Sequence, residues 1–220
     1  TRVFRGAGEL KQSITASSFD AWTKFYQQGP DAVNNIVSYY AKGALIALWL
    51  DLTIRSKSNH QYSLDTLMRE LWIHFGRTNT GTTEDDFINI ANLLCGEDIS
   101  TTFKRHLDSN ERIDISKELA EYGVELQKQK FKKLNSLETT PATCYHAYLG
   151  AHYKAQTLGL VINQVLENSP AANAGLAVND TLIAIDNIKI TESTIQALFD
   201  HLSVNTELTC HFFRDDQLLS

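Results

Sequence analysis

Residues 169–176 read S-P-A-A-N-A-G-L, and they mark a short helix with a turn on each side. Proline is favoured at the first helical position, where its missing N–H is not needed, so Pro170 predicts the start of this helix. Gly175 predicts its end, because glycine takes up a positive φ at a helix C-terminus without strain. Apolar runs on both sides, at residues 159–162 and 181–185, indicate strands.

The sequence around this stretch predicts a small β-rich α+β domain. We expect strands over residues 158–165, 181–185 and 207–213, and a helix over residues 194–202. Upstream, residues 128–143 are charged and then reach Thr139-Thr140-Pro141, which breaks regular structure. We therefore predict two domains, residues 1–135 and 140–220, and expect the second to be cut short at its C-terminal end.

The second domain resembles a bacterial PDZ domain in the order of its elements: an apolar strand, S-P-A-x-x-A-G-L, and then N-D-x-L leading into a strand. The resemblance implies a groove that binds peptide C-termini. Leu149, Gly150 and Ala151 would form the carboxylate-binding loop through successive backbone N–H groups. Ile195 and Leu198 would line the apolar pocket, although a helix on a small sheet needs both equally as core residues.

The first 125 residues carry helical patterns without a strand signal and predict an all-α bundle. The expected helices cover residues 19–26 (capped by Ser17 or Ser18), 33–55, 63–76, 87–95, one from Ser100 and one from Asp114 or Ser116. In the long helix, spacing predicts a buried face made of Ile36, Tyr40, Ala44, Ala47, Leu48 and Leu52. In the next helix, it predicts burial of Leu64, Met68, Leu71, Trp72 and Phe75.

Residues 37–45, V-S-Y-Y-A-K-G-A-L, are the most informative part of the long helix. A phenol here can donate a hydrogen bond to a developing oxyanion. Paired tyrosines on an amphipathic helix are also typical of half-buried core residues. The residues alone leave both interpretations open.

The order of motifs across nearly the whole chain resembles the glycyl aminopeptidase family. The matching segments are Ser18 with Ala21 and Trp22, then residues 37–55, 63–72 and 83–87. This family implies a zinc metallopeptidase with a thermolysin-like, gluzincin catalytic domain followed by a PDZ domain. In related enzymes a Y-E-K-G motif supplies a tyrosine to the tetrahedral intermediate. Residues 40–43 match it with Ala41 in place of glutamate, so the resemblance implies a catalytic role for Tyr40, with Tyr39 as the alternative.

The metal motif of such peptidases, H-E-x-x-H, does not occur in this sequence. None of the histidines is followed by glutamate, and none pairs with another four residues on; they are His60, His74, His106, His146, His152, His201 and His211. We therefore predict no metal ligand in this chain and expect zinc to be held upstream, in a full-length parent. The predicted function is the C-terminal part of a zinc-dependent aminopeptidase, inactive by itself; the alternative is a non-catalytic peptide-binding module.

Composition limits the other classes of function. The net charge of −6 without a basic run argues against nucleic acid, and no apolar stretch reaches membrane-spanning length. The expected partners are peptide or protein substrates and peptide C-termini. Cys95, Cys144 and Cys210 form no CxxC pair, which favours a reducing compartment, hence the cytoplasm, with the periplasm as alternative. Cys144 near His146 is a weak candidate for a thiol nucleophile, because nothing in the sequence orients the base.

Overall fold

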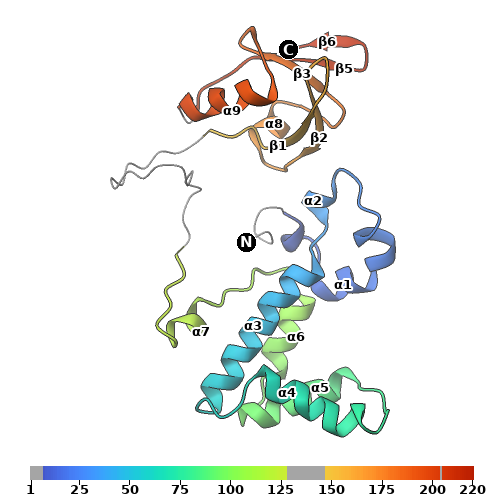
Figure 1. Cartoon of the computed structure of the whole chain (residues 1–220), viewed down its shortest axis with the longest axis vertical. Helices are drawn as coiled ribbons and strands as arrows, with labels where there is room; N and C mark the ends of the chain where they lie inside the picture. The colour runs from blue at the N-terminus through green and yellow to red at the C-terminus, as the bar shows by residue number, and fades with distance from the viewer. Residues whose placement is uncertain (1–6, 128–146, 204) are drawn as a thin grey trace. The chain divides into compact units, whose positions relative to one another are not determined.

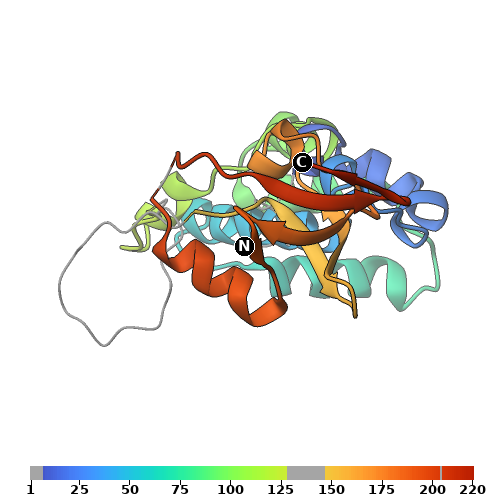
Figure 2. The ribbon, with the colours of Figure 1, turned by 90° about the horizontal axis from the view of Figure 1, so that it is seen from above.

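The computed structural model describes residues 7–127, 147–203 and 205–220. The chain divides into two compact units: unit 1 is Thr1–Gln27 with Asn35–Leu126, and unit 2 is Gln28–Asn34 with Gln127–Ser220. Unit 1 is helical, and unit 2 contains a sheet with helix α9 to one side of it (Figures 1 and 2). The boundary predicted between residues 135 and 140 lies outside the described residues.

Unit 1 forms around helix α3, and its described residues contain helices and no strand, as the sequence predicts. Its helices are α1 (Ile14–Phe19), α3 (Tyr39–Lys57), α4 (Leu64–Leu71), α5 (Glu84–Cys95), α6 (Ser100–Asp108) and α7 (Ser116–Ala120). Shorter helical turns cover Gly8–Leu10, Ala21–Phe25 and Trp72–Gly76. The first three residues of the four-residue helix α2 (Ala32–Asn35) belong to unit 2. The core joins Ile46, Leu50 and Ile54 of α3 to Leu67 of α4 and Ala91 of α5.

The predicted long helix from residue 33 is wrong at its start, because the chain breaks between α2 and α3. The Ser38 side chain accepts a hydrogen bond from the Ala41 N–H at 3.2 Å and so caps α3. Helix α1 is likewise capped by Ser13, not by Ser17 or Ser18. Ser17 is instead buried and donates to the Val37 carbonyl oxygen at 2.6 Å. Side-chain caps therefore set both helix starts, and apolar spacing does not reveal them.

The buried face of α3 also differs from the prediction. The buried residues of the helix are Lys42, Ile46, Trp49, Leu50, Leu52, Thr53 and Ile54, and of these Leu52 was predicted. Tyr40 and Leu48, predicted to be buried, have exposed fractions of 61% and 40%. The error arises at Lys42, whose charge suggests a solvent-facing position although its side chain is only 1% exposed.

Helix α4 begins where the sequence predicts, but its buried face is different. Ser63 precedes it, and the Ser63 N–H donates to Thr66 Oγ1 at 3.2 Å. Leu67 is fully buried, whereas Met68 and Trp72 are 56% and 60% exposed. The predicted ends of α5 at Gly96 and the start of α6 at Ser100 are confirmed.

Unit 2 is an antiparallel sheet with the strand order β1-β2-β3-β5-β6, and β4 pairs with β3. The strands are β1 (Ala151–Ala155), β2 (Leu160–Val165), β3 (Thr181–Ile185), β4 (Ile188–Lys189), β5 (Cys210–Arg214) and β6 (Gln217–Leu219). The helices are α8 (Pro170–Asn173) and α9 (Glu192–His201). The three predicted strands and the helical turn at Pro170 are confirmed. Strand β1 is the strand after Gly150 that the PDZ resemblance implies, while β4 and β6 were not predicted. The core gathers Leu160, Ile162, Leu182, Ile185 and Ile195.

An ion pair between the buried Asp180 and the partly exposed Arg214 fixes the turn that follows α8. The Asp180 carboxylate is 1% exposed and accepts hydrogen bonds from Arg214 Nε at 2.9 Å and Arg214 Nη2 at 2.8 Å. It also accepts from the Ala177 N–H at 2.7 Å. Arg214 in turn donates to the Gly175 carbonyl oxygen at 2.7 Å, so one side chain joins β5 to the end of the α8 turn. No helix among the described residues is long and apolar enough to cross a membrane.

Candidate functional site

Three tyrosines of unit 1 bring their phenol groups together at the start of α3. Tyr39 and Tyr40 are the first two residues of this helix, directly after its cap at Ser38. Tyr26 Oη lies 3.0 Å from Tyr39 Oη and 2.9 Å from Tyr40 Oη. The Tyr39 and Tyr40 rings are 4.3 Å apart between centroids, and Phe25 packs 4.9 Å from the Tyr39 ring. We call Tyr26, Tyr39 and Tyr40 the tyrosine cluster.

The members of the tyrosine cluster differ in exposure and in acidity. Tyr39 is half-buried against the core of unit 1, whereas Tyr40 is 61% exposed. Hydrogen bonding to Tyr26, and then to Tyr39, lowers the pKa of Tyr40. The same network, with the Tyr26 bond first, raises the pKa of Tyr39. The more exposed phenol is therefore also the more acidic one, and an acidic phenol is a strong hydrogen-bond donor.

Tyr26 is the member that sequence reasoning missed as a site residue. The sequence assigns it to an apolar helix face together with Phe19, Trp22 and Phe25. Instead, Phe19 and Trp22 are 89% and 78% exposed, and a π-helical turn over Ala21–Phe25 carries the chain toward Tyr26. The sequence shows only an aromatic pair at residues 25 and 26. This pair does not show that Tyr26 forms a hydrogen bond with Tyr40, which lies 14 residues further along the chain.

A buried cluster of charges supports the start of α3 from inside unit 1. Lys42 Nζ donates to the Ser109 carbonyl oxygen at 3.3 Å. Glu9, which is 2% exposed, has its Oε1 2.7 Å from Arg112 Nε. Burial raises the pKa of Glu9, and Arg112 and Lys42 partly offset this effect. Burial likewise lowers the pKa of Lys42, against the opposing effect of Glu9. The lysine of the Y-A-K-G motif is thus buried and has a structural role.

In unit 2, Gly150 shapes the loop predicted to bind a carboxylate. Its φ is 78°, in the left-handed region that favours glycine. A Cβ atom at Gly150 would lie 2.2 Å from the Ser169 Cβ, so no other residue fits here without a shift. The Ser169 hydroxyl donates to the Gly150 carbonyl oxygen at 3.1 Å, and the Ala171 N–H donates to the Leu149 carbonyl oxygen at 2.9 Å.

These contacts hold the loop through its carbonyl groups. Within the part of the chain that the structure describes, the N–H groups of Leu149 and Gly150 have no hydrogen-bond acceptor. Two successive N–H groups of this kind, next to a residue with positive φ, can bind an anionic group.

The other predicted groove residues lie close to the core of unit 2. Leu149 and Ala151 are partly buried against it, and so is Leu198 of α9. Ile195 has an exposed fraction of 0%, which makes it a member of the core in this conformation. The structure thus gathers all five predicted peptide-binding residues within one unit.

Metal and thiol chemistry find little support among the described residues. No group of three or more His, Cys, Asp or Glu side chains in this part of the chain is placed to hold a metal ion. Burial raises the pKa of Cys95 to about 11 and also raises that of Cys210, and both thiols are free. Cys144 and His146 lie outside the described residues.

Comparison with known proteins connects these two units to two families. Residues 1–46 match the M61 glycyl aminopeptidase family, and residues 161–209 match the PDZ domain. No curated protein matches the chain. Among solved structures, the chain is similar to the crystal structure of an aminopeptidase N family protein from Idiomarina loihiensis, with 43% identity and a TM-score of 0.87. The match covers 99% of this chain and 37% of that protein. These findings confirm the predicted resemblance to the glycyl aminopeptidase family with a PDZ domain.

Proposed function

We propose that this chain is part of a zinc-dependent aminopeptidase and that Tyr40 stabilises the oxyanion of the tetrahedral intermediate. The single observation that supports this role best is the hydrogen bond between Tyr26 Oη and Tyr40 Oη at 2.9 Å, beside an exposed Tyr40 side chain. The whole activity is a proposal, because the chain spans 37% of the related protein.

The chemistry of Tyr40 follows from its surroundings. When Tyr26 donates its proton to Tyr40 Oη, the Tyr40 proton is free to point toward a substrate oxygen. The lowered pKa of Tyr40 strengthens that donation. Tyr40 also lies in the first turn of the 19-residue helix α3, whose positive dipole end favours a developing negative charge. Both effects act on the transition state more than on the neutral substrate.

The family resemblance implies a zinc ion that activates the peptide bond when it is bound. The described residues do not provide a set of ligands for it, so we derive no step through the metal. We propose that its ligands belong to the rest of a longer protein. We also propose that the present chain cleaves no peptide bond by itself. Stoichiometric zinc together with aminopeptidase activity in the purified chain would contradict this part.

The test of the catalytic role is Tyr40→Phe in the longer enzyme. Loss of one oxyanion donor lowers kcat by roughly 10²–10³-fold, with KM much less affected. Tyr39→Phe is the matched control: it removes a neighbouring phenol that is half-buried, and we expect less than about a tenfold loss of kcat. An unchanged kcat in Tyr40→Phe would refute the role.

A second function, capture of peptide C-termini by unit 2, is supported by the unbonded N–H groups of Leu149 and Gly150. In this alternative the chain acts as a peptide-binding module. Backbone N–H groups in a nest would bind the terminal carboxylate, and the peptide would add a strand to the sheet edge at β1. The test compares matched peptides with free and amidated C-termini, and equal affinity for both would refute carboxylate capture.

A further inference from the structure

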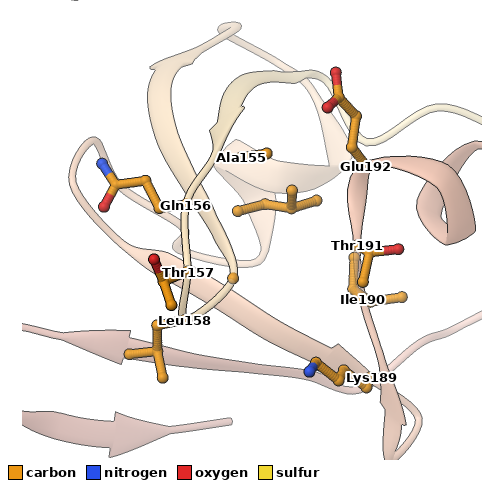
Figure 3. A pocket seen from close by; sticks show the side chains of 10 residues that line it. Ala155, Gln156, Thr157, Leu158, Lys189, Ile190, Thr191 and Glu192 are labelled. Atoms are coloured by element: carbon orange, nitrogen blue, oxygen red, sulfur yellow. The ribbon is translucent and has the colours of Figure 1, made fainter.

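A small hollow opens in unit 2 where β1 ends and α9 begins, at the opposite end of β1 from Gly150. Its volume is about 110 Å³. One wall is the turn from β1 into β2, residues 155–160, and the other is the segment leading into α9, residues 189–192. Figure 3 shows these two segments facing each other across it.

Apolar side chains form the floor of the hollow, polar side chains such as Gln156, Thr157 and Thr191 line its walls, and the rim carries opposite charges. Leu160 and Ile190 are each 1% exposed, and Leu158 is 61% exposed beside them. Lys189 and Glu192 lie toward opposite ends of the hollow (Figure 3). One positive and one negative side chain stand at the rim, so the rim carries no net charge.

Strand β1 links this hollow to the loop at Gly150. Among the described strands β1 pairs only with β2, so its other edge is free to pair with an added strand. Tyr153, two residues before Ala155 and so on the same face of β1, packs on the core of unit 2. Ala155 lines the hollow together with residues 189–192, so this face of β1 lies toward the start of α9. Burial raises the pKa of Tyr153, and the Glu192 carboxylate adds to this effect.

The length of β1 determines which part of a peptide reaches the hollow. A peptide bound antiparallel to β1, with its carboxylate at Leu149 and Gly150, advances about 3.4 Å per residue along the strand. Strand β1 has five residues, Ala151–Ala155. About the fifth residue from the peptide C-terminus therefore lies beside Ala155, with alternate side chains directed toward α9.

We propose that this hollow binds an uncharged aliphatic side chain, of the size of valine or leucine, at about the fifth residue from the C-terminus of a peptide bound along β1. The inference rests on the proposed capture of peptide C-termini by unit 2. The hollow, at about 110 Å³, is smaller than an enclosed cavity of roughly 150 Å³ that holds a benzene molecule, so it cannot enclose a whole tryptophan side chain. Its apolar floor and balanced rim favour an aliphatic group over a charged one.

The test uses the whole chain and fluorescent hexapeptides that share their last four residues. The fifth residue from the C-terminus is Leu, Gly, Asp, Lys or Trp. Burial of one aliphatic side chain in a small, partly open site predicts that the Leu peptide binds about 5–20-fold more tightly than the Gly peptide. We expect the Asp, Lys and Trp peptides to bind no more tightly than the Gly peptide.

Two variants connect the preference to the hollow. Leu158→Ala should reduce the preference for Leu over Gly to less than about threefold, because it removes apolar surface from the rim. Leu218→Ala is the matched control, since Leu218 is similarly exposed, at 58%, but lies on β6 outside the hollow. It should leave the preference unchanged. Ala155→Leu, which fills the hollow, should remove the preference and retain binding that depends on a free carboxylate.

The outcomes separate this inference from the function on which it rests. Equal affinity for all five peptides, with binding still dependent on a free C-terminus, overturns the role of the hollow alone. Absence of binding by every peptide, or equal binding of free and amidated forms, overturns both. A Leu preference that survives Ala155→Leu also overturns the assignment to the hollow.

Discussion

The phenol oxygens of Tyr26 and Tyr40 lie 2.9 Å apart, and this bond connects a turn that precedes α2 along the chain to the first turn of α3. The bond lowers the pKa of Tyr40. Removing it by Tyr26→Phe is expected to raise the Tyr40 pKa toward the ordinary value of a tyrosine and to lower that of Tyr39. In the longer enzyme, the same change should reduce kcat and shift the alkaline side of its pH profile upward.

These shifts are measurable by NMR of carbon-labelled tyrosine rings during an alkaline titration, with Tyr40→Phe and Tyr39→Phe used to assign the signals. Tyr62→Phe is the control, because Tyr62 is 41% exposed and lies outside the tyrosine cluster. It should remove one signal and leave the others in place. A Tyr40 pKa unchanged by Tyr26→Phe would show that the bond has no effect on its acidity.

Two glycines of unit 2 allow the cost of backbone strain to be measured apart from the cost of a steric clash. Gly175 has a φ of 79° with open space around it, so Gly175→Ala should cost about 1–2 kcal/mol of stability. Gly150 has a similar φ, but a Cβ there would lie 2.2 Å from the Ser169 Cβ. Gly150→Ala should therefore cost at least about 3 kcal/mol. Exchange of the Ile162 amide, which bonds the Asp180 carbonyl oxygen at 2.9 Å, reports unfolding of this unit. Equal losses of stability in Gly150→Ala and Gly175→Ala would show that the protein moves Ser169 away from the new Cβ without cost.

The buried carboxylate of Asp180 is expected to stabilise unit 2 strongly. Asp180→Ala removes the acceptor of two Arg214 bonds and of the Ala177 N–H, and should cost about 2–4 kcal/mol. Glu207→Ala, at an exposed position of the same unit, should change stability by less than about 0.5 kcal/mol. Amide exchange in β2 and β3 measures both. If Asp180→Ala lost as little stability as Glu207→Ala, water would have to replace these hydrogen bonds fully.

The buried Glu9 makes the stability of unit 1 depend on pH. Burial raises the pKa of Glu9 in the folded protein. The resulting contribution of Glu9 to the free energy of unfolding is fully present below the unfolded pKa, and it is lost as the pH rises through the higher folded pKa. Glu9→Gln cannot titrate, so the wild-type chain should lose stability relative to this variant as the pH rises above the ordinary glutamate pKa of about 4.5 and through the higher folded value.

Urea unfolding followed by the fluorescence of Trp49, which is 4% exposed in the core of unit 1, provides the measurement. Glu125→Gln, at an exposed position, is the control, and its free energy of unfolding should differ from that of the wild type by the same amount at each pH. A constant difference for Glu9→Gln as well would contradict the raised pKa.

The sequence located most helices of unit 1 and the longer strands of the PDZ-like unit, but it misjudged which faces are buried. Local signals such as Ser63, Gly96 and Pro170 act on neighbouring residues, so the sequence shows them directly. Burial depends on the partners of each helix. Lys42 illustrates this, because its charge is acceptable in the interior only with Glu9 nearby and the Ser109 carbonyl oxygen at 3.3 Å.

The candidate sites also contain residues that the sequence predicted and residues that only the fold revealed. The two tyrosines at the start of α3 and the loop around Gly150 were predicted from motifs, and both remain candidates. Tyr26, the charge cluster and the hollow beside Ala155 were not predicted. Each of them depends on residues far apart in the chain, such as Glu9 and Arg112, that only the folded backbone brings together.

By itself, the sequence determined the order of helical and β-rich parts, the turn chemistry at Gly150 and Gly175, and the family resemblance, because these depend on residue types at short spacing. The tertiary structure decided which tyrosine is exposed, which phenol forms a hydrogen bond with it, and which side chains surround the hollow. These depend on distances of a few ångströms between separate elements. Tyr40 was one of two adjacent phenols in the sequence; in the fold it is the exposed one, with a neighbouring phenol that makes it more acidic.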